Sequence, residues 1–147
     1  MYLLDSNIYI RAFTRGGDDP AFRAFHHDAL PRLILSAVVV HELLVGAQTP
    51  AHRHQLERGL IEPFRTRRRV HVPTLGTWVL AAQFDRDLRA LGGFNASLTQ
   101  RSFGNDLLLA ATARELGATI ITHNLADFEL IGRVTQLKAV GPWPSAT

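Results

Sequence analysis

The sequence predicts an α/β domain of three layers, in which a mostly parallel sheet of about four to five strands is flanked by helices. Short apolar runs alternate with helical patterns, and turn residues separate the two along most of the chain. With 147 residues, of which 46% are hydrophobic, the chain is long enough to bury one core. No repeat or low-complexity linker interrupts it, so residues 1–147 are expected to form a single domain.

Each element follows from its local pattern. Apolar runs predict strands at Tyr2–Leu4, Leu33–Leu35, Val70–Val72, Ala118–Ile121 and Leu137–Val140. Helical spacing predicts a helix from after Asp5 to about Phe13, a second that begins at Pro20, and a third from after Ser36 to about Ala47. A fourth begins at Thr49 and Pro50. Three more are predicted at Thr74–Leu91, Leu107–Leu116 and roughly Asp127–Ile131. Ser36 is placed to cap its helix, while turns or helix ends are expected at Gly16, Gly17, Gly92, Gly93 and Gly117.

Composition excludes several kinds of site. The chain has no cysteine, which excludes disulfides, thiolate zinc sites and a cysteine nucleophile. Lys138 is the only lysine among 16 cationic residues, and the arginine excess reflects either phosphate binding or a GC-rich genome. No apolar run has the length of a membrane span and no signal-peptide pattern opens the sequence, so we expect a cytoplasmic protein without membrane contact.

Four acidic residues are predicted to converge at one edge of the sheet, beyond the carboxyl ends of the strands, where parallel sheets bind ligands. Asp5 follows the first strand, Glu42 lies six residues after Ser36, and Asp127 follows the fourth strand. Asp106 precedes the helix that leads to the fourth strand, which places it at the same edge.

Each acid also has an ordinary structural interpretation. Aspartate is a preferred helix cap, so Asp5, Asp106 and Asp127 could each begin a helix, and Glu42 could point to solvent. Taken together, clustered carboxylates raise each other's pKa and destabilise the fold unless a cation neutralises them. Mg²⁺ or Mn²⁺ with oxygen ligands fits such a cluster and would activate water for attack on a phosphodiester.

Four segments, in order, resemble the motifs of PIN domains, in particular the toxins of VapBC toxin–antitoxin systems. They are Tyr2-Leu-Leu-Asp5-Ser-Asn-Ile8, Ser36-Ala-Val-Val-Val-His-Glu42-Leu-Leu-Val-Gly46, Gly104-Asn-Asp106-Leu-Leu-Leu-Ala-Ala111 and Gly117-Ala-Thr-Ile-Ile-Thr-His-Asn124-Leu-Ala-Asp127-Phe128. The resemblance implies a PIN-like fold and endonucleolytic cleavage of RNA with Mg²⁺ or Mn²⁺. It also implies a small antitoxin protein that blocks the site, and a homodimer.

The resemblance assigns Asp5, Glu42 and Asp106 as metal ligands and Thr122 as a supporting hydroxyl. Asn124 stands where one version of the pattern has an acid, so Asp127 is our candidate for the fourth carboxylate. The sequence leaves open whether Asn124 or Asp127 faces the metal.

The polar residues beside these acids are expected to differ in their roles. Ser6 and Asn7 are expected to orient Asp5 or a metal-bound water, although Ser6 could simply cap a helix. His41 and His123 are expected to be surface or packing residues rather than ligands.

Arginines supply candidate RNA contacts. Arg11, Arg15 and Arg101 lie near the predicted acids and are our candidates for phosphate binding. The run of Arg65, Arg67, Arg68 and Arg69 enters the third strand, so topology places it at the opposite edge, as a solvated or antitoxin-facing loop. The apolar residues of the helix from Thr74 are mostly expected in the core, with part of that surface left for a dimer or antitoxin interface.

Two other functions compete with a nuclease. A phosphotransfer domain would phosphorylate Asp5, but it needs a lysine near the phosphate, and Lys138 lies far along the chain from every candidate acid. A catalytically weakened PIN-like module would bind RNA or protein without cutting; Asn124 keeps this possibility open, and the set of Asp5, Glu42 and Asp106 argues against it.

Overall fold

The computed structural model describes residues 1–14, 19–92 and 100–145. It confirms the predicted α/β class: five parallel strands form one sheet in the order β3-β2-β1-β4-β5. The strands are β1 (Tyr2–Leu4), β2 (Leu33–Ser36), β3 (Val70–His71), β4 (Thr119–Ile121) and β5 (Lys138–Val140). Because all of them run the same way, every loop that leaves a strand begins at the same edge of the sheet.

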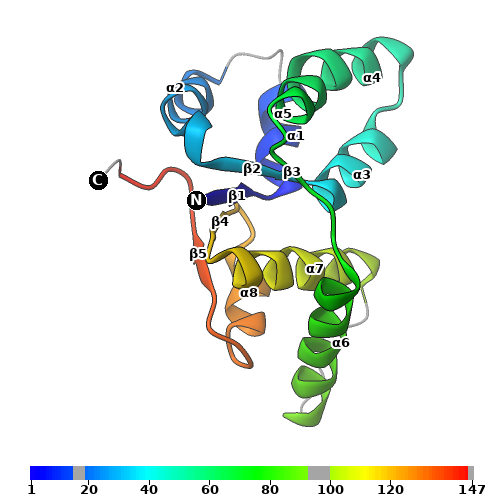
Figure 1. The fold of residues 1–147 in the computed structure, drawn as a ribbon, viewed down its shortest axis with the longest axis vertical. Coiled ribbons are helices and arrows are strands. Elements are labelled where there is room, and N and C mark those ends of the chain that lie inside the picture. Colours follow the sequence, from blue (N-terminus) through cyan, green and yellow to red (C-terminus); the bar gives the residue numbers. More distant parts are fainter. Residues whose placement is uncertain (15–18, 93–99, 146–147) are drawn as a thin grey trace.

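Helices cover both faces of the sheet and complete the three layers (Figure 1). On one side lie α1 (Ser6–Thr14), α2 (Pro20–Ala29), α4 (Pro50–Leu56) and α5 (Glu62–Thr66), with α3 (Ala37–Gly46) at the end of β2. On the other side lie α6 (Leu75–Ala90), α7 (Arg101–Leu116) and α8 (Leu125–Ile131). A 3₁₀ turn, η1 (Leu30–Arg32), precedes β2, and a π-helical turn, η2 (Glu57–Ile61), joins α4 to α5. None of the helices in these described ranges combines the length and apolarity needed to span a membrane.

The helix boundaries agree with several of the predicted caps. The Ser36 hydroxyl accepts the Val38 N–H at 3.1 Å, and the Thr49 hydroxyl accepts the His52 N–H at 3.1 Å. Gly117 ends α7 with a φ of 63°, a left-handed conformation that costs glycine little. The turn predicted at Gly16 and Gly17, and the helix end predicted at Gly93, lie outside the described residues.

The prediction for α7 was wrong at its amino end, because this helix begins at Arg101 and not at Leu107. Polar and small residues before Leu107 concealed the first turns from a search for apolar runs. The buried Phe103, four residues before Leu107, continues the apolar face of the helix backwards. Asp106 therefore lies in the second turn of α7 and does not precede it.

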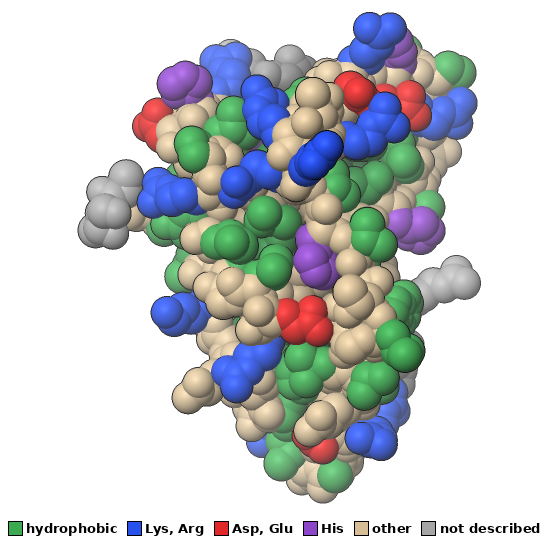
Figure 2. All heavy atoms as spheres, in the orientation of Figure 1, with side chains coloured by type: hydrophobic (Ala, Val, Ile, Leu, Met, Phe, Trp, Pro, Cys, Tyr) green, Lys and Arg blue, Asp and Glu red, His purple; other side chains and the backbone are tan. Residues whose placement is uncertain are grey.

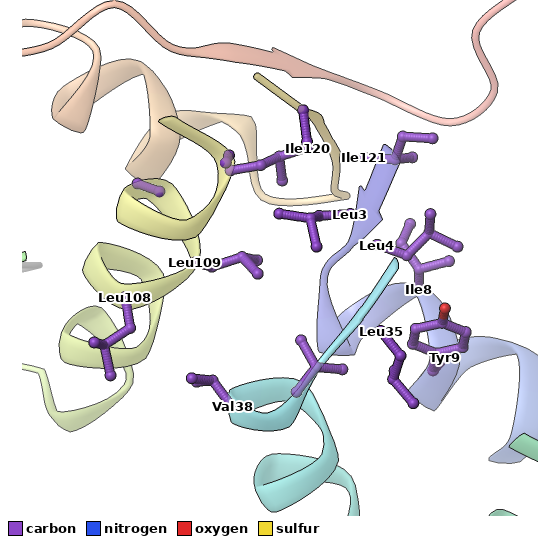
Figure 3. Close-up of a cluster of buried hydrophobic side chains, with 14 of the residues drawn as sticks. Leu3, Leu4, Ile8, Tyr9, Leu35, Val38, Leu108, Leu109, Ile120 and Ile121 are labelled. Carbon is purple, nitrogen blue, oxygen red and sulfur yellow. The ribbon is translucent and has the colours of Figure 1, made fainter. Parts of the chain in front are cut away.

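The core packs on both faces of the central strand, β1. In the sheet, Leu3 pairs with Ile120 and Leu4 with Ile121, so the two pairs point to opposite faces. Leu3 and Ile120 point toward Leu109 of α7, whereas Leu4 and Ile121 lie beside α1 (Figure 3). All five of these residues are at most 2% exposed. This packing fixes α1 and α7 against the carboxyl ends of β1 and β4.

Candidate active site

Asp5 leaves β1 and leads directly into α1, and its side chain is only 5% exposed. Its backbone N–H donates to the Ile121 carbonyl at 2.9 Å, which ties it to β4. Its Oδ1 accepts the Ser6 backbone N–H at 2.7 Å. Its Oδ2 accepts the Thr122 hydroxyl at 2.7 Å and the Asn7 amide at 3.0 Å. The carboxylate is therefore held in one orientation by three residues.

Thr122 joins the ends of β1 and β4. It is fully buried, and besides donating to Asp5 its hydroxyl accepts the Asn124 backbone N–H at 2.9 Å and the Asn7 Nδ2 at 3.1 Å. The Asn7 Oδ1 accepts the His123 backbone N–H at 3.2 Å. These bonds make a small polar network at the carboxyl edge that holds Asp5 from two strands.

Burial governs the ionisation of Asp5. Removal from water raises the pKa of its carboxyl, because a charged group loses hydration there. Hydrogen bonds from Thr122, Ser6 and Asn7 lower the pKa and so oppose that effect. The net pKa shift is upward, so these hydrogen bonds do not fully replace the lost water.

Asp106 shows that the four predicted acids share one electrostatic environment. It is 9% exposed, and burial together with the charges of Asp5, Asp127 and Glu42 raises its pKa to about 8. A side-chain hydrogen bond to Asp127 contributes in the same direction. Near neutral pH, Asp106 is therefore largely protonated when no cation is bound.

Two asparagines hold the outer carboxylates of the cluster. Asn105 donates from Nδ2 to the Glu42 Oε1 at 3.0 Å, and Asn124 donates from Nδ2 to the Asp127 Oδ2 at 2.8 Å. Asn124 and Asp127 are thus hydrogen-bonded to each other, and which of them would face a metal stays open. Asn105 was not identified as a candidate from the sequence. The feature that could have identified it is its position directly before Asp106, on a helix whose amino end lies at this edge.

Arg11 lies beside the cluster and is exposed. Its Nη1 is 3.4 Å from each ring nitrogen of His123, and burial, followed by the positive charge of Arg11, lowers the pKa of that histidine. Arg15 lies outside the described residues, as does the side chain of Arg101.

The chemistry of the donors fits a hard cation. The four acids and two asparagines offer only oxygen as ligand atoms at this edge, which is the preference of Mg²⁺ and Mn²⁺. Within the described ranges, no three His, Asp or Glu side chains stand close enough to hold a metal ion together in their present positions. Mg²⁺ is commonly bound through one or two carboxylates and several waters, so it does not require three protein ligands already in place.

Comparison with protein-family models gives a match to the PIN domain over residues 2–133. The chain belongs to the PIN-domain family. A search of curated proteins gave no match.

Solved structures show the same PIN fold. FitAB bound to an IR36 DNA fragment is 20% identical, with a TM-score of 0.74, over 100% of this chain and 99% of that one. VapBC2 from Rickettsia felis, bound to a DNA fragment from its promoter, is 20% identical, with a TM-score of 0.69, over 97% and 98%. VapBC-1 from nontypeable Haemophilus influenzae is 24% identical, with a TM-score of 0.64, over 95% and 96%.

The four acids of this PIN domain differ in whether they also serve as helix caps or surface residues. Asp5 directly precedes α1, and its carboxylate accepts the N–H of the adjacent Ser6 while it also belongs to the polar network. Asp106 is not a helix cap, because it lies inside α7. Asn124, and not Asp127, occupies the cap position of α8. Glu42 is half-buried and bonded to Asn105.

Lys138 does not approach Asp5. It opens β5 and therefore lies at the amino edge of the sheet, whereas Asp5 lies at the carboxyl edge of the same parallel sheet. This separation argues against the phosphotransfer alternative, which requires a lysine beside the phosphorylated aspartate.

Proposed function

We propose that this PIN domain is an endoribonuclease dependent on Mg²⁺ or Mn²⁺, and that it is the toxin of a type II toxin–antitoxin pair. The observation that carries the proposal is the pKa of Asp106, raised to about 8 by burial and by three neighbouring acids. Such a cluster destabilises a fold, and perturbed carboxylates of this kind gather at functional sites.

A divalent cation would relieve this repulsion. Asp5 and Asp106 are the best-buried acids of the cluster and would hold the ion, with Glu42 and Asp127 as additional ligands reached through water or by side-chain rotation. Binding would displace the proton of Asp106. When bound, the ion would activate a water and neutralise charge on the scissile phosphate.

The neighbouring residues position this machinery. Thr122, Asn7 and Ser6 fix the Asp5 carboxylate, so its oxygens need little reorganisation when a ligand arrives. Asn105 and Asn124 hold Glu42 and Asp127 in the same way.

Arg11 is the described cation that is best placed to bind RNA. It is exposed and lies against His123, which directly follows Thr122 of the polar network. An arginine here would bind a backbone phosphate and position the strand without reading its sequence. Arg15 and Arg101 stay as candidates on the basis of the sequence.

The assignment as a toxin is supported by what the similar structures contain. FitAB, VapBC2 and VapBC-1 were solved as pairs of proteins, and a further match of 19% identity and TM-score 0.62, over 99% of this chain and 100% of that one, is a toxin–antitoxin complex from Klebsiella pneumoniae. The present chain also exposes large apolar side chains on α6, at Leu75, Trp78 and Val79. Such a surface suits a protein partner, which we propose is an antitoxin or a second copy of the chain.

The direct test is cleavage of RNA by purified protein, read by mapping new 5′ ends. We expect cleavage with Mg²⁺ or Mn²⁺, none in EDTA, and none with Asp106→Asn prepared in parallel. Expression in cells with and without the adjacent small reading frame tests the toxin assignment. Cleavage that persists in EDTA would refute the metal mechanism, and unimpaired growth on expression alone would refute the toxin assignment.

A catalytically weakened module that binds RNA or protein is the second candidate. Two observations favour it. Among the described residues, no three acids lie close enough together to bind a metal ion, and Asn124 carries no charge. For this alternative, RNA binding would be retained while no metal supports cleavage.

A further inference from the structure

Positive charges line the edge of the sheet opposite the acids. Because all five strands are parallel, their amino ends lie at one edge, and a basic side chain stands at or shortly before four of them, β2, β3, β4 and β5. These cations are Arg69 before β3, Arg32 before β2, Arg114 before β4, and Arg133 and Lys138 at β5. The pattern is visible only once the strands are known to be parallel and ordered.

Along the half of this edge at β2 and β3, Arg69 and Arg32 contact neutral groups. Arg69 donates from Nε to the Leu33 carbonyl at 2.8 Å, and the Arg32 guanidinium lies 5.4 Å from the centre of the Tyr2 ring. Neither contact cancels the charge of the arginine. A band of basic side chains crosses the face of the molecule where α5 leads into β3 (Figure 2).

The link between α5 and β3 adds more positive charge to this half. Arg65 is paired with Glu62 at 2.7 Å, whereas Arg67 donates to the Pro63 carbonyl, a neutral partner, at 3.1 Å. Arg68 is exposed and has a φ of 55°, a left-handed conformation in which glycine would be less strained. The local backbone therefore gives no reason for an arginine at this position, which points to a role for its side chain.

The half at β4 and β5 is hollowed. A surface pocket of about 740 Å³ is lined by Arg114, Arg133 and Lys138, and no acidic residue is among its lining residues. Arg114 contacts Gln136, a neutral partner, at 3.4 Å. The carboxyl ends of α7 and α8 also meet this pocket and contribute about half a negative charge each. Three full positive charges exceed that contribution, so the pocket stays positive.

We propose that these residues form one phosphate-binding track for the RNA substrate, the amino-edge track, made of Arg32, Arg67, Arg68, Arg69, Arg114, Arg133 and Lys138. The proposal rests on the proposed function and extends it, because it places part of the substrate backbone away from the acids. Five strands about 4.8 Å apart give the track a length of about 19 Å. Strands of two to four residues, at about 3.3 Å each, separate the two edges by only about 7–13 Å.

A nucleic-acid backbone fits this track better than a protein partner does. The guanidinium fork matches phosphate, and a row of separated cations matches a repeating anion. Protein interfaces are centred on apolar residues. Apart from Met1, the large exposed apolar side chains among the described residues lie on α1, on α3, on α6 and the residue that ends it, or between β3 and α6. A folded RNA that reaches both edges would therefore bind more tightly than a short strand held at the acids alone.

The test compares two double variants with the same loss of charge. Arg68→Gln with Lys138→Gln removes one cation from each half of the track, and Arg53→Gln with Arg86→Gln removes two exposed arginines from α4 and α6. Binding of a labelled stem-loop RNA is measured by fluorescence anisotropy in EDTA over a range of salt concentrations. Cleavage of a short unstructured oligoribonucleotide is measured separately with Mg²⁺.

We expect the track variant to bind the stem-loop about tenfold more weakly, and the slope of log K against log salt to fall by about 2. The α4 and α6 variant should stay within about twofold of the wild type, and all three proteins should cut the short oligonucleotide equally. Equal weakening by both variants, or no weakening by the track variant, would overturn the proposal. If the wild type cuts no RNA, the proposed function fails, while the binding data still decide whether the track exists.

Discussion

The metal-free wild type should become less stable as the pH rises, because Asp106 loses a proton. In Asp106→Asn, most of this pH dependence should disappear. The folded-state pKa of about 8 lies above the usual 3.8, so the folded protein holds a proton that the unfolded chain releases. A raised pKa gives stability that is complete below the unfolded-state value and is lost as the pH rises through the folded-state value. Wild-type stability should therefore fall continuously toward about pH 8.

The magnitude follows from the proton linkage. Each pH unit between the two pKa values costs about 1.36 kcal/mol, so a rise from about pH 6.5 to pH 8 costs about 2 kcal/mol. This corresponds to a fall in Tm of about 4–8 °C for a chain of this length. The window begins near pH 6.5, the ordinary pKa of histidine, and burial lowers the pKa of His26 below that value, so its titration falls mainly below the window. The pKa of Asp5 is also raised, so any contribution from that carboxyl has the same sign.

The assay is thermal unfolding in EDTA at several pH values, for the wild type, Asp106→Asn and Asp87→Asn. Asparagine at position 106 keeps the shape of the side chain and cannot ionise, so its Tm should change little across the window. Asp87 is an exposed acid on α6, and its variant should follow the wild type. A wild-type Tm that does not fall, or a parallel fall in Asp106→Asn, would refute the electrostatic account of the cluster.

The remaining predictions concern the metal and the residues that hold the acids. Mg²⁺ or Mn²⁺ should raise the Tm of the wild type through preferential binding to the folded state, and much less that of Asp5→Asn; equal shifts would contradict the site. Asp106→Asn should cut RNA at least about a hundredfold more slowly, and activity near that of the wild type would exclude it as a ligand. Thr122→Val should lower the free energy of unfolding by about 1–3 kcal/mol and also lower activity, because the buried Asp5 carboxylate loses a hydrogen-bond donor. Thr122→Ser keeps the hydroxyl group and should keep the activity. Asn105→Ala should weaken metal-dependent activity about tenfold with little loss of Tm, since it releases the half-buried Glu42; an unchanged rate would make Asn105 purely structural.

Much of the fold could be predicted because local patterns specify it. Alternating apolar runs and helical spacing identified five strands, and the hydroxyl groups of Ser36 and Thr49 marked the starts of two helices. The start of α7 was missed, because Ser102, Gly104 and Asn105 are weak helix formers and the burial of Phe103 against the core could not be seen from local pattern.

The edge where the candidate acids come together was predictable from the sequence, whereas their role as metal ligands stays a prediction. Strand ends in a parallel sheet bring Asp5 and the residues after β4 together, so a pattern of acids after strands locates the edge. The partners of those acids were harder to assign, because a hydrogen bond between Asn105 and Glu42 spans 63 positions and depends on how α3 and α7 face each other.

The sequence by itself determined the α/β class, the absence of thiol chemistry, and the edge at which the acids gather. Tertiary structure decided the pKa of Asp106, since that value depends on burial and on three charges brought in from distant segments. It also decided that Asn124 and Asp127 bond to each other and that basic side chains border four of the five strands at the opposite edge. Electrostatic interactions depend on distance through space and on exposure to water, and the order of residues along a chain determines neither until the chain has folded.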